Sequence, residues 1–164
     1  MSTRDAPDAT AAPRALDGPP PRVLAISAPY YAEVVGGMLA GARDVLGAAG
    51  ARLDEAEVAG AFELPAALRM GLRAAAHEGF LVLGCVVRGE TDHYDLICRE
   101  AGRGVMDLAV ETGTPIGFAL LTVDTIAQAE ARSRPGDRHN KGAEAAHALL
   151  GQIALARRME ALRG

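Results

Sequence analysis

Three clusters of polar and aromatic residues directly follow apolar segments of this sequence and carry groups that could bind a ligand or transfer a proton. They are Tyr30-Tyr31, Gly60-Ala61-Phe62-Glu63 and Arg88-Gly89-Glu90-Thr91-Asp92-His93. In the third cluster, Gly89 permits a tight turn, and Glu90 and Thr91 begin a stretch of helical pattern. Backbone amides at the start of a helix bind phosphate, and Arg88 can add positive charge there. The cluster therefore predicts an anion site.

His93 lies at the mouth of that predicted helix, beside the anion site. Imidazole exchanges protons near neutral pH, so this position suits general acid and base catalysis. A single histidine on a helix is more often structural, and both interpretations stay open at this point. The remaining histidines lack this setting and are interpreted as packing or solvent-facing residues: His77, His139 and His147.

Several common chemistries have no signature in the sequence. It contains no GxxxxGK[ST] loop, no GxGxxG after a strand, and no His, Cys and Asp spacing that would hold zinc. These observations disfavour NTP hydrolysis, dinucleotide chemistry and a metal centre. Lys141 is the sole lysine, so a substrate amine is a better candidate nucleophile than an enzyme amine. Cys85 and Cys98 have neither metal nor redox spacing and are expected to be reduced core thiols.

The overall composition is that of one ordinary domain: 164 residues, of which 49% are hydrophobic. A net charge of −4 gives no basic excess for a nucleic acid partner. No apolar run is long enough for a membrane helix and the start lacks a signal-peptide pattern, so we expect a cytoplasmic protein with no membrane contact. Residues 1–21 are rich in Ala, Pro and Asp, which predicts a disordered tail before a domain over 22–164.

From Arg22 onward, short apolar segments alternate with longer helical patterns. This alternation predicts an α/β fold with a four-stranded parallel sheet flanked by helices on both faces. Residues 80–87 are apolar throughout, as a central strand requires, whereas the mixed pattern of 52–58 suits an edge strand. The other strands are expected at 23–27 and 116–122. Helices are expected at about 32–49, 64–77, from the third cluster to 111, at 125–132, and from after residue 140 to 162.

Four glycines fall inside the first predicted helix: Gly36, Gly37, Gly41 and Gly47. Each weakens a helix by about 1 kcal/mol relative to alanine, so close packing on the sheet or on another subunit is expected to compensate. A four-stranded sheet is thin, and small residues line helix faces at 36–47 and 143–156. These faces predict contacts with other subunits, and hence a homo-oligomer.

The strings VAGAFELP at 58–65 and GCVVRGETDHYD at 84–95 resemble the signature segments of 6,7-dimethyl-8-ribityllumazine synthases, and Asn140-Lys141-Gly142 resembles a third. The resemblance extends over residues 22–160, in order and with similar spacing. It implies a flavodoxin-like three-layer sandwich and a transferase of riboflavin biosynthesis. The implied reaction condenses 5-amino-6-(D-ribitylamino)uracil with 3,4-dihydroxy-2-butanone 4-phosphate, the penultimate step of that pathway, and requires neither a cofactor nor a metal.

Carried over by position, the resemblance assigns proton transfer to His93. It assigns pyrimidine binding to Tyr30, Ala61, Phe62, Glu63, Cys85, Val86, Val87 and Phe118. Phosphate binding falls to Glu90, Thr91 and Arg132, with Glu90 acting only through its backbone because its carboxylate would repel phosphate. Phe118 and Arg132 are implied to reach the pocket of a neighbouring subunit. Supporting positions near the same pocket are Lys141 and Glu144.

The implied assembly is a homo-oligomer whose sites are shared between neighbouring subunits. The segment between Arg132 and Lys141 is slightly longer than in family members that form hollow shells, and the proline-rich tail is unsuited to adding a strand to a neighbour. These features favour a homopentamer, or two such pentamers paired into a decamer, over a sixty-subunit shell. Small-molecule substrates are the expected ligands, and riboflavin synthase is a candidate protein partner.

Departures from the family pattern surround Tyr30, which occupies the place of the aromatic that stacks on the pyrimidine ring. Tyr30 stands where Phe is commoner, Pro29 precedes it in place of the usual Arg, and Tyr31 follows in place of a smaller polar residue. Pocket entry is therefore expected to differ. A non-catalytic paralogue that binds lumazine or flavin in the same pocket is the main alternative, and a cage-like structural protein is another. The presence of His93 and Arg132 favours the enzyme.

Overall fold

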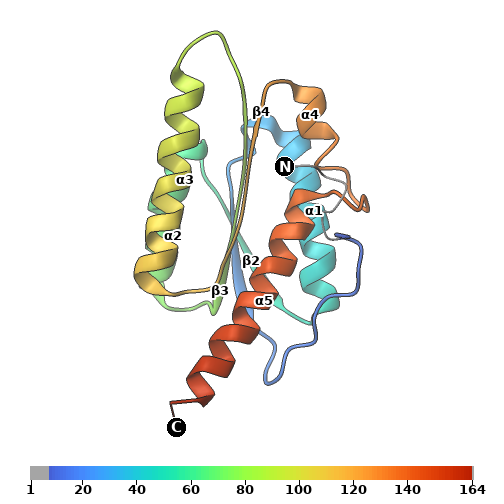
Figure 1. Ribbon diagram of the computed structural model, residues 1–164, viewed down its shortest axis with the longest axis vertical. Coiled ribbons are helices and arrows are strands. Elements are labelled where there is room, and N and C mark those ends of the chain that lie inside the picture. Colours follow the sequence, from blue (N-terminus) through green and yellow to red (C-terminus); the bar gives the residue numbers. More distant parts are fainter. Residues whose placement is uncertain (1–7, 164) are drawn as a thin grey trace.

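The computed structural model describes residues 8–163, in which four strands form one parallel sheet (Figure 1). The strands are β1 (Arg22–Ser27), β2 (Arg52–Glu57), β3 (Gly79–Val87) and β4 (Ile116–Val123). The α-helices are α1 (Ala32–Ala48), α2 (Leu64–Ala74), α3 (His93–Thr112), α4 (Ile126–Glu130) and α5 (Lys141–Ala161). Short 3-10 turns, η2 (Pro29–Tyr31) and η3 (Ala61–Glu63), precede α1 and α2. Among these helices, none has the length and apolar character needed to cross a bilayer.

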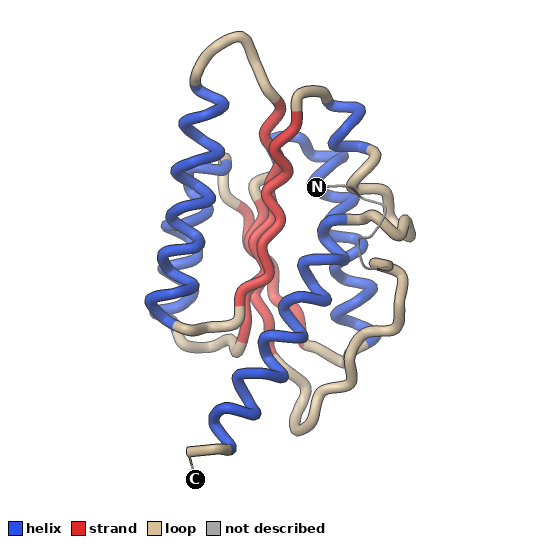
Figure 2. Tube along the Cα trace, viewed as in Figure 1, coloured by secondary structure: helices blue, strands red, loops and turns tan. Residues whose placement is uncertain are grey.

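The sheet has the strand order β2-β1-β3-β4, so the predicted central and edge strands are confirmed. Helices α2 and α3 cover one face, and α1, α4 and α5 cover the other, which makes three layers (Figure 2). Strand β3 is buried along almost its whole length because it has a neighbouring strand on each side and helices on both faces. Two apolar cores result. One includes Met38 and Leu149 on the α1 and α5 side, and the other includes Leu68 and Phe80 on the α2 and α3 side.

Residues 8–21 form no helix or strand but lie against the domain. The Ala9 side chain is buried in the core on the α1 and α5 side, and its carbonyl lies 3.2 Å from His147 Nε2. Arg157 of α5 donates a hydrogen bond of 2.8 Å to the Pro19 carbonyl. A buried alanine and contacts from side chains to backbone carbonyls thus hold parts of this segment of low hydrophobicity against the domain, while the disorder of the tail stays a prediction. The first seven residues, for which disorder was also predicted, lie outside the described part.

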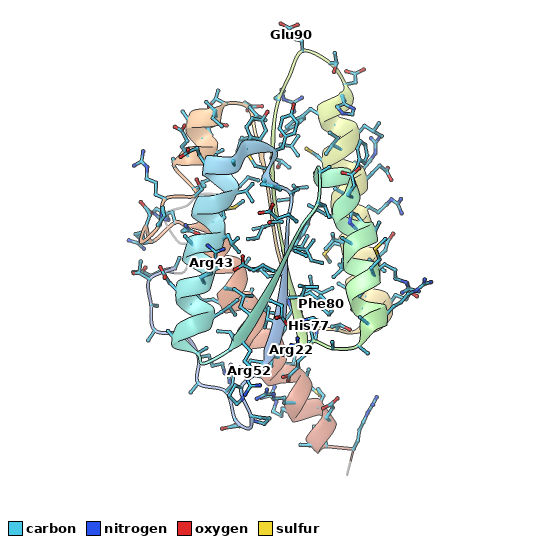
Figure 3. The ribbon with its side chains drawn as sticks, turned by 180° about the vertical axis from the view of Figure 1, so that it is seen from behind. Arg22, Arg43, Arg52, His77, Phe80 and Glu90 are labelled. Carbon is cyan, nitrogen blue, oxygen red and sulfur yellow. The ribbon has the colours of Figure 1, made fainter. Side chains whose placement is uncertain are left out.

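A polar cluster joins strands at the amino end of the sheet, opposite the loop that carries Glu90 (Figure 3). The Asp54 carboxylate accepts a hydrogen bond of 2.8 Å from Arg22 Nε and lies 2.8 Å from His77 Nε2. The hydrogen bond with His77, and then that with Arg22, holds the pKa of Asp54 below its usual range. The His77 ring also packs edge-on against Phe80, with centroids 5.9 Å apart. This histidine is therefore a packing residue, as its sequence setting suggested.

Glycines allow α1 to lie unusually close to α5 and to the segment before it. A Cβ on Gly37 would stand 2.3 Å from the Ser133 carbonyl oxygen, and a Cβ on Gly142 would stand 2.0 Å from that of Met38. Gly41 is equally enclosed, whereas a Cβ on Gly36 or Gly47 would have nothing within 4 Å of it in the described chain. Close packing thus accounts for two of the four glycines in α1.

The glycine at the helix crossing predicts a stability difference between two alanine variants. Gly142→Ala should destabilise the protein by about 1–3 kcal/mol, because its Cβ would meet backbone atoms of α1 that cannot rotate away. Gly36→Ala, the control, should stabilise it by up to about 1 kcal/mol through helix propensity. Urea unfolding followed by far-UV circular dichroism, at one fixed protein concentration, measures both. Equal midpoints for the two variants would contradict the close approach.

Candidate active site

A pocket of about 400 Å³ lies at the carboxyl ends of β1, β2 and β3. Because the strands are parallel, the loops that follow them meet at one edge of the sheet, where α/β proteins bind their ligands. All three clusters singled out in the sequence contribute to its walls. The lining residues are Tyr30, Tyr31, Ala59, Gly60, Ala61, Phe62, Glu63, Cys85, Val86, Val87, Gly89, Thr91, His93, Tyr94 and Ile97.

Every predicted pyrimidine-binding residue except Phe118 lines this pocket, as do Thr91 and His93. Glu90 is exposed in the adjoining loop and is absent from the pocket wall (Figure 3). Phe118 of β4 is half-buried against the core on the α2 and α3 side. Arg132 follows α4, and its Nη1 donates a hydrogen bond of 2.8 Å to the Gln128 carbonyl. The assignment of Phe118 and Arg132 to a neighbouring subunit's pocket stays a prediction.

The two supporting residues lie at the start of α5, apart from the pocket wall of their own chain. Lys141 Nζ lies 2.6 Å from Glu144 Oε2, and both side chains are about three-quarters buried. One turn of helix separates them, so the pair is a local i,i+3 contact. It neutralises the single lysine, which therefore presents no unpaired amine in the described structure.

Two rings from separate elements adjoin at the pocket mouth. The Phe62 ring belongs to η3 and the His93 ring begins α3, and their centroids lie 5.8 Å apart with a tilt of 55°. Phe62 leaves 42% of its surface exposed and Tyr30 leaves 76%, so large aromatic faces are open to a ligand. Val86 and Val87 supply the apolar strand end behind them. A flat heteroaromatic ring fits this arrangement, with an imidazole beside it for proton transfer.

Arg88 contacts carboxylates on two other parts of the chain. Its Nε donates a hydrogen bond of 3.0 Å to Asp124, which follows β4, and its Nη2 lies 3.5 Å from Asp95 of α3. The guanidinium carbon lies 4.1 Å from the centre of the Tyr94 ring. These contacts join the loop that carries Glu90 to the end of β4 and to α3, and whether the Arg88 charge also acts on a bound anion stays a prediction. The hydrogen bond with Asp124 raises the pKa of Arg88.

Sequence reasoning missed two lining residues on α3, Tyr94 and Ile97. Ile97 follows His93 by four residues, so helical periodicity places both on one face of the helix. That spacing was the available signal for Ile97. Tyr94 lies next to His93 in the sequence and had no comparable signal of helical spacing.

Cys85 contributes an apolar rather than a reactive wall. It is buried on β3 and carries a free thiol, as does the partly buried Cys98. Burial raises the pKa of the Cys85 thiol to about 11, so the sulfur is neutral at physiological pH. Of the two cysteines, only Cys85 is fully buried, so the expected core position holds for Cys85 and not for Cys98. Residues 8–163 contain no group of three or more His, Cys, Asp or Glu placed to hold a metal ion.

The three-layer fold and its pocket define a flavodoxin-like α/β protein with a small-molecule site at the strand ends. Residues 20–157 match the family model described as 6,7-dimethyl-8-ribityllumazine synthase. The chain belongs to this family. The resemblance inferred from the signature strings is thereby confirmed.

Individual relatives with the same description match most of this chain. The 6,7-dimethyl-8-ribityllumazine synthase of Methylobacterium radiotolerans is 44% identical over 142 residues, covering 87% of this chain and 86% of the relative. That of Azorhizobium caulinodans is 45% identical, covering 84% and 87% respectively. That of Kineococcus radiotolerans is 47% identical, covering 82% and 84%. The similarity therefore spans nearly the full length on both sides.

The raised pKa of Cys85 predicts slow alkylation. With a pKa of about 11, the thiolate fraction at pH 8 is on the order of a hundredfold below that of an ordinary thiol, and the rate should rise about tenfold per pH unit. Iodoacetamide labelling between pH 7 and 9.5, followed by mass spectrometry of the Cys85 peptide, measures this against glutathione. Circular dichroism at each pH shows that the protein stays folded. A plateau below pH 9 would contradict the assignment.

Proposed function

We propose that this chain condenses 5-amino-6-(D-ribitylamino)uracil with 3,4-dihydroxy-2-butanone 4-phosphate to 6,7-dimethyl-8-ribityllumazine. The observation that carries the proposal is the pocket mouth, where the Phe62 and His93 rings lie 5.8 Å apart in a member of the lumazine synthase family. Each relative described above bears the name of this synthase. The proposed reaction is the penultimate step of riboflavin biosynthesis.

The pyrimidine is proposed to lie along the end of β3, against Val86 and Val87, with Tyr30 and Phe62 as stacking surfaces. The exposed Glu63 carboxylate accepts hydrogen bonds from the ribityl hydroxyls. Ala61 and Cys85 contribute backbone and apolar contacts, which suits a neutral thiol. This arrangement presents the substrate's amine toward the mouth, where His93 lies.

The chemistry needs positioning and proton transfer more than a reactive enzyme group. The substrate's primary amine adds to the ketone carbon and the adduct loses water to give an imine. A proton then leaves the hydroxyl-bearing carbon as the C–O bond to phosphate breaks, and the resulting enol becomes a methyl ketone by gaining a proton on carbon and losing its hydroxyl proton. The ribitylamino nitrogen adds to this ketone carbon, and loss of a second water closes the ring. The imidazole of His93 is proposed to accept and return these protons, while the pocket holds the two substrates in reacting geometry.

The phosphate is proposed to bind in the turn directly before α3, through the backbone amides of Glu90 and Thr91. Its counter-charge is Arg132 of a neighbouring subunit, and Phe118 completes the pyrimidine site from the same subunit. Lys141 and Glu144 fix the start of α5 beside Arg132, since Lys141 N donates to the Arg132 carbonyl at 2.9 Å. The enzyme in this proposal is a cytoplasmic homo-oligomer, with a pentamer as the preferred assembly and riboflavin synthase as a candidate partner.

Replacement of His93 tests the proposed reaction. Wild-type protein mixed with the two substrates should raise lumazine fluorescence well above the spontaneous rate. His93→Ala should lower kcat about tenfold or more with little loss of pyrimidine affinity, because positioning survives when the proton carrier is lost. His147→Ala, remote from the pocket, is the control. Tight pyrimidine binding by wild-type protein without turnover would contradict the proposed catalytic function and favour the non-catalytic paralogue.

Replacement of Arg132 tests the shared phosphate site. Arg132→Ala should raise KM for the phosphate substrate about 10- to 100-fold, the expected loss of one charge-assisted hydrogen bond, and leave the pyrimidine Kd unchanged. Steady-state kinetics with each substrate varied separately gives both values. Arg134→Ala, an exposed arginine of the same loop, should behave as wild type. Similar KM values for Arg132→Ala and Arg134→Ala would show that Arg132 does not bind the phosphate.

A further inference from the structure

Asn140 is a buried polar residue whose side chain joins three parts of the chain. It is 1% exposed and stands at the N-cap of α5, where Oδ1 accepts a hydrogen bond of 3.0 Å from Ala143 N. Its Nδ2 lies 3.0 Å from each of the carbonyl oxygens of Gly37, Ser133 and Arg134. The amide therefore connects α1, the loop after α4 and the first turn of α5.

The site is built for this amide. A Cβ on Gly41 would stand 2.6 Å from Asn140 Cγ, so the glycine leaves the space that the side chain occupies. An Asp here would cap α5 but donate no hydrogen bond to the carbonyls, and a Ser would cap it without reaching them. We call the contacts of Asn140 Nδ2 with the three carbonyls the clamp. Capping α5 and forming the clamp together require both the oxygen and the nitrogen of a side-chain amide, with the enclosed Gly41 opposite.

The clamp holds the loop that carries Arg132. The carbonyls of the two residues directly after Arg132 accept from the Asn140 amide, and the Arg132 carbonyl itself accepts from Lys141 N at 2.9 Å. The loop is irregular from Ala131 to Asn140, so no helix or strand fixes it. Its path past Arg132 is set by these bonds and by the contact of Ser133 with Gly37 of α1.

We propose that Asn140 is a positioning residue for the reaction: by fixing the backbone beside Arg132, it places the guanidinium where a neighbouring pocket requires a phosphate counter-charge. The inference rests on the proposed function, in which Arg132 binds phosphate. Asn140 itself touches no substrate. Its effect should therefore appear in phosphate recognition and should pass through Arg132.

The test uses Asn140→Ser, which keeps an N-cap oxygen and removes the clamp. KM for 3,4-dihydroxy-2-butanone 4-phosphate should rise about tenfold or more, since small misplacements of a binding group are costly, while kcat and the pyrimidine Kd change less than about twofold. The double variant with Arg132→Ala should have the KM of Arg132→Ala alone, because the guanidinium that Asn140 positions is then absent.

A second variant acts on the same contact without changing Asn140. The added methyl group of Gly41→Ala would displace the Asn140 amide and should reproduce the rise in KM. This variant therefore tests the positioning role even where Asn140→Ser folds poorly. Gly47→Ala, in the same helix with nothing near its Cβ, should leave KM unchanged. Agreement of Gly41→Ala with Asn140→Ser supports the positioning role.

Contrary outcomes separate this inference from the function on which it rests. If Arg132→Ala raises KM but Asn140→Ser and Gly41→Ala do not, the positioning role is overturned and the proposed function stands. Effects of Asn140→Ser that multiply those of Arg132→Ala, with kcat and pyrimidine affinity falling together, would show a merely structural role and overturn it as well. If Arg132→Ala itself leaves KM unchanged, the phosphate assignment fails and the inference fails with it.

Discussion

Parallel pairing of the strands in the order β2-β1-β3-β4 is the constraint on which the pocket depends. Because all four strands run the same way, each is followed by a loop at the same edge of the sheet. The chain leaves β1 toward one side to form β2 and returns to the other side to form β3, so the connections diverge between β1 and β3. Open α/β sheets bind ligands at such a switch point. Phe62 and His93, which are thirty-one positions apart in sequence (93 − 62), come together for this reason.

In the helix layer on the α1 and α5 side, the close approach of the helices to each other and to the loop after α4 fixes that loop. Gly142 lets α5 approach the α1 backbone at Met38, Gly37 lets the loop after α4 approach α1 at Ser133, and Gly41 leaves the space that the Asn140 side chain occupies. A helix that carries several glycines is intrinsically weak, so its stability comes from this packing rather than from propensity. The same close packing also fixes the segment that carries Arg132, the residue proposed to bind phosphate.

The sequence predicts the order and type of the elements well because hydrophobic periodicity and glycine-rich turns are local signals. It also locates the pocket, since residues that directly follow apolar strands must lie at the carboxyl edge. The role of Arg88 depends on Asp124, and that of Asn140 on Gly37, a hundred and three positions away (140 − 37). The anchoring of Ala9 on the domain is equally non-local. Such contacts have no periodic signature, so sequence patterns do not reveal them.

The central claim is that the pyrimidine lies in the pocket at the ends of β1, β2 and β3. A crystal structure of the protein with 6,7-dimethyl-8-ribityllumazine bound tests it most directly. The account predicts the fused ring against Val86 and Val87, beside the Phe62 ring, with the ribityl chain toward Glu63 and the reacting edge facing His93. A ring bound elsewhere on the protein, with this pocket empty at saturating ligand, would contradict the account.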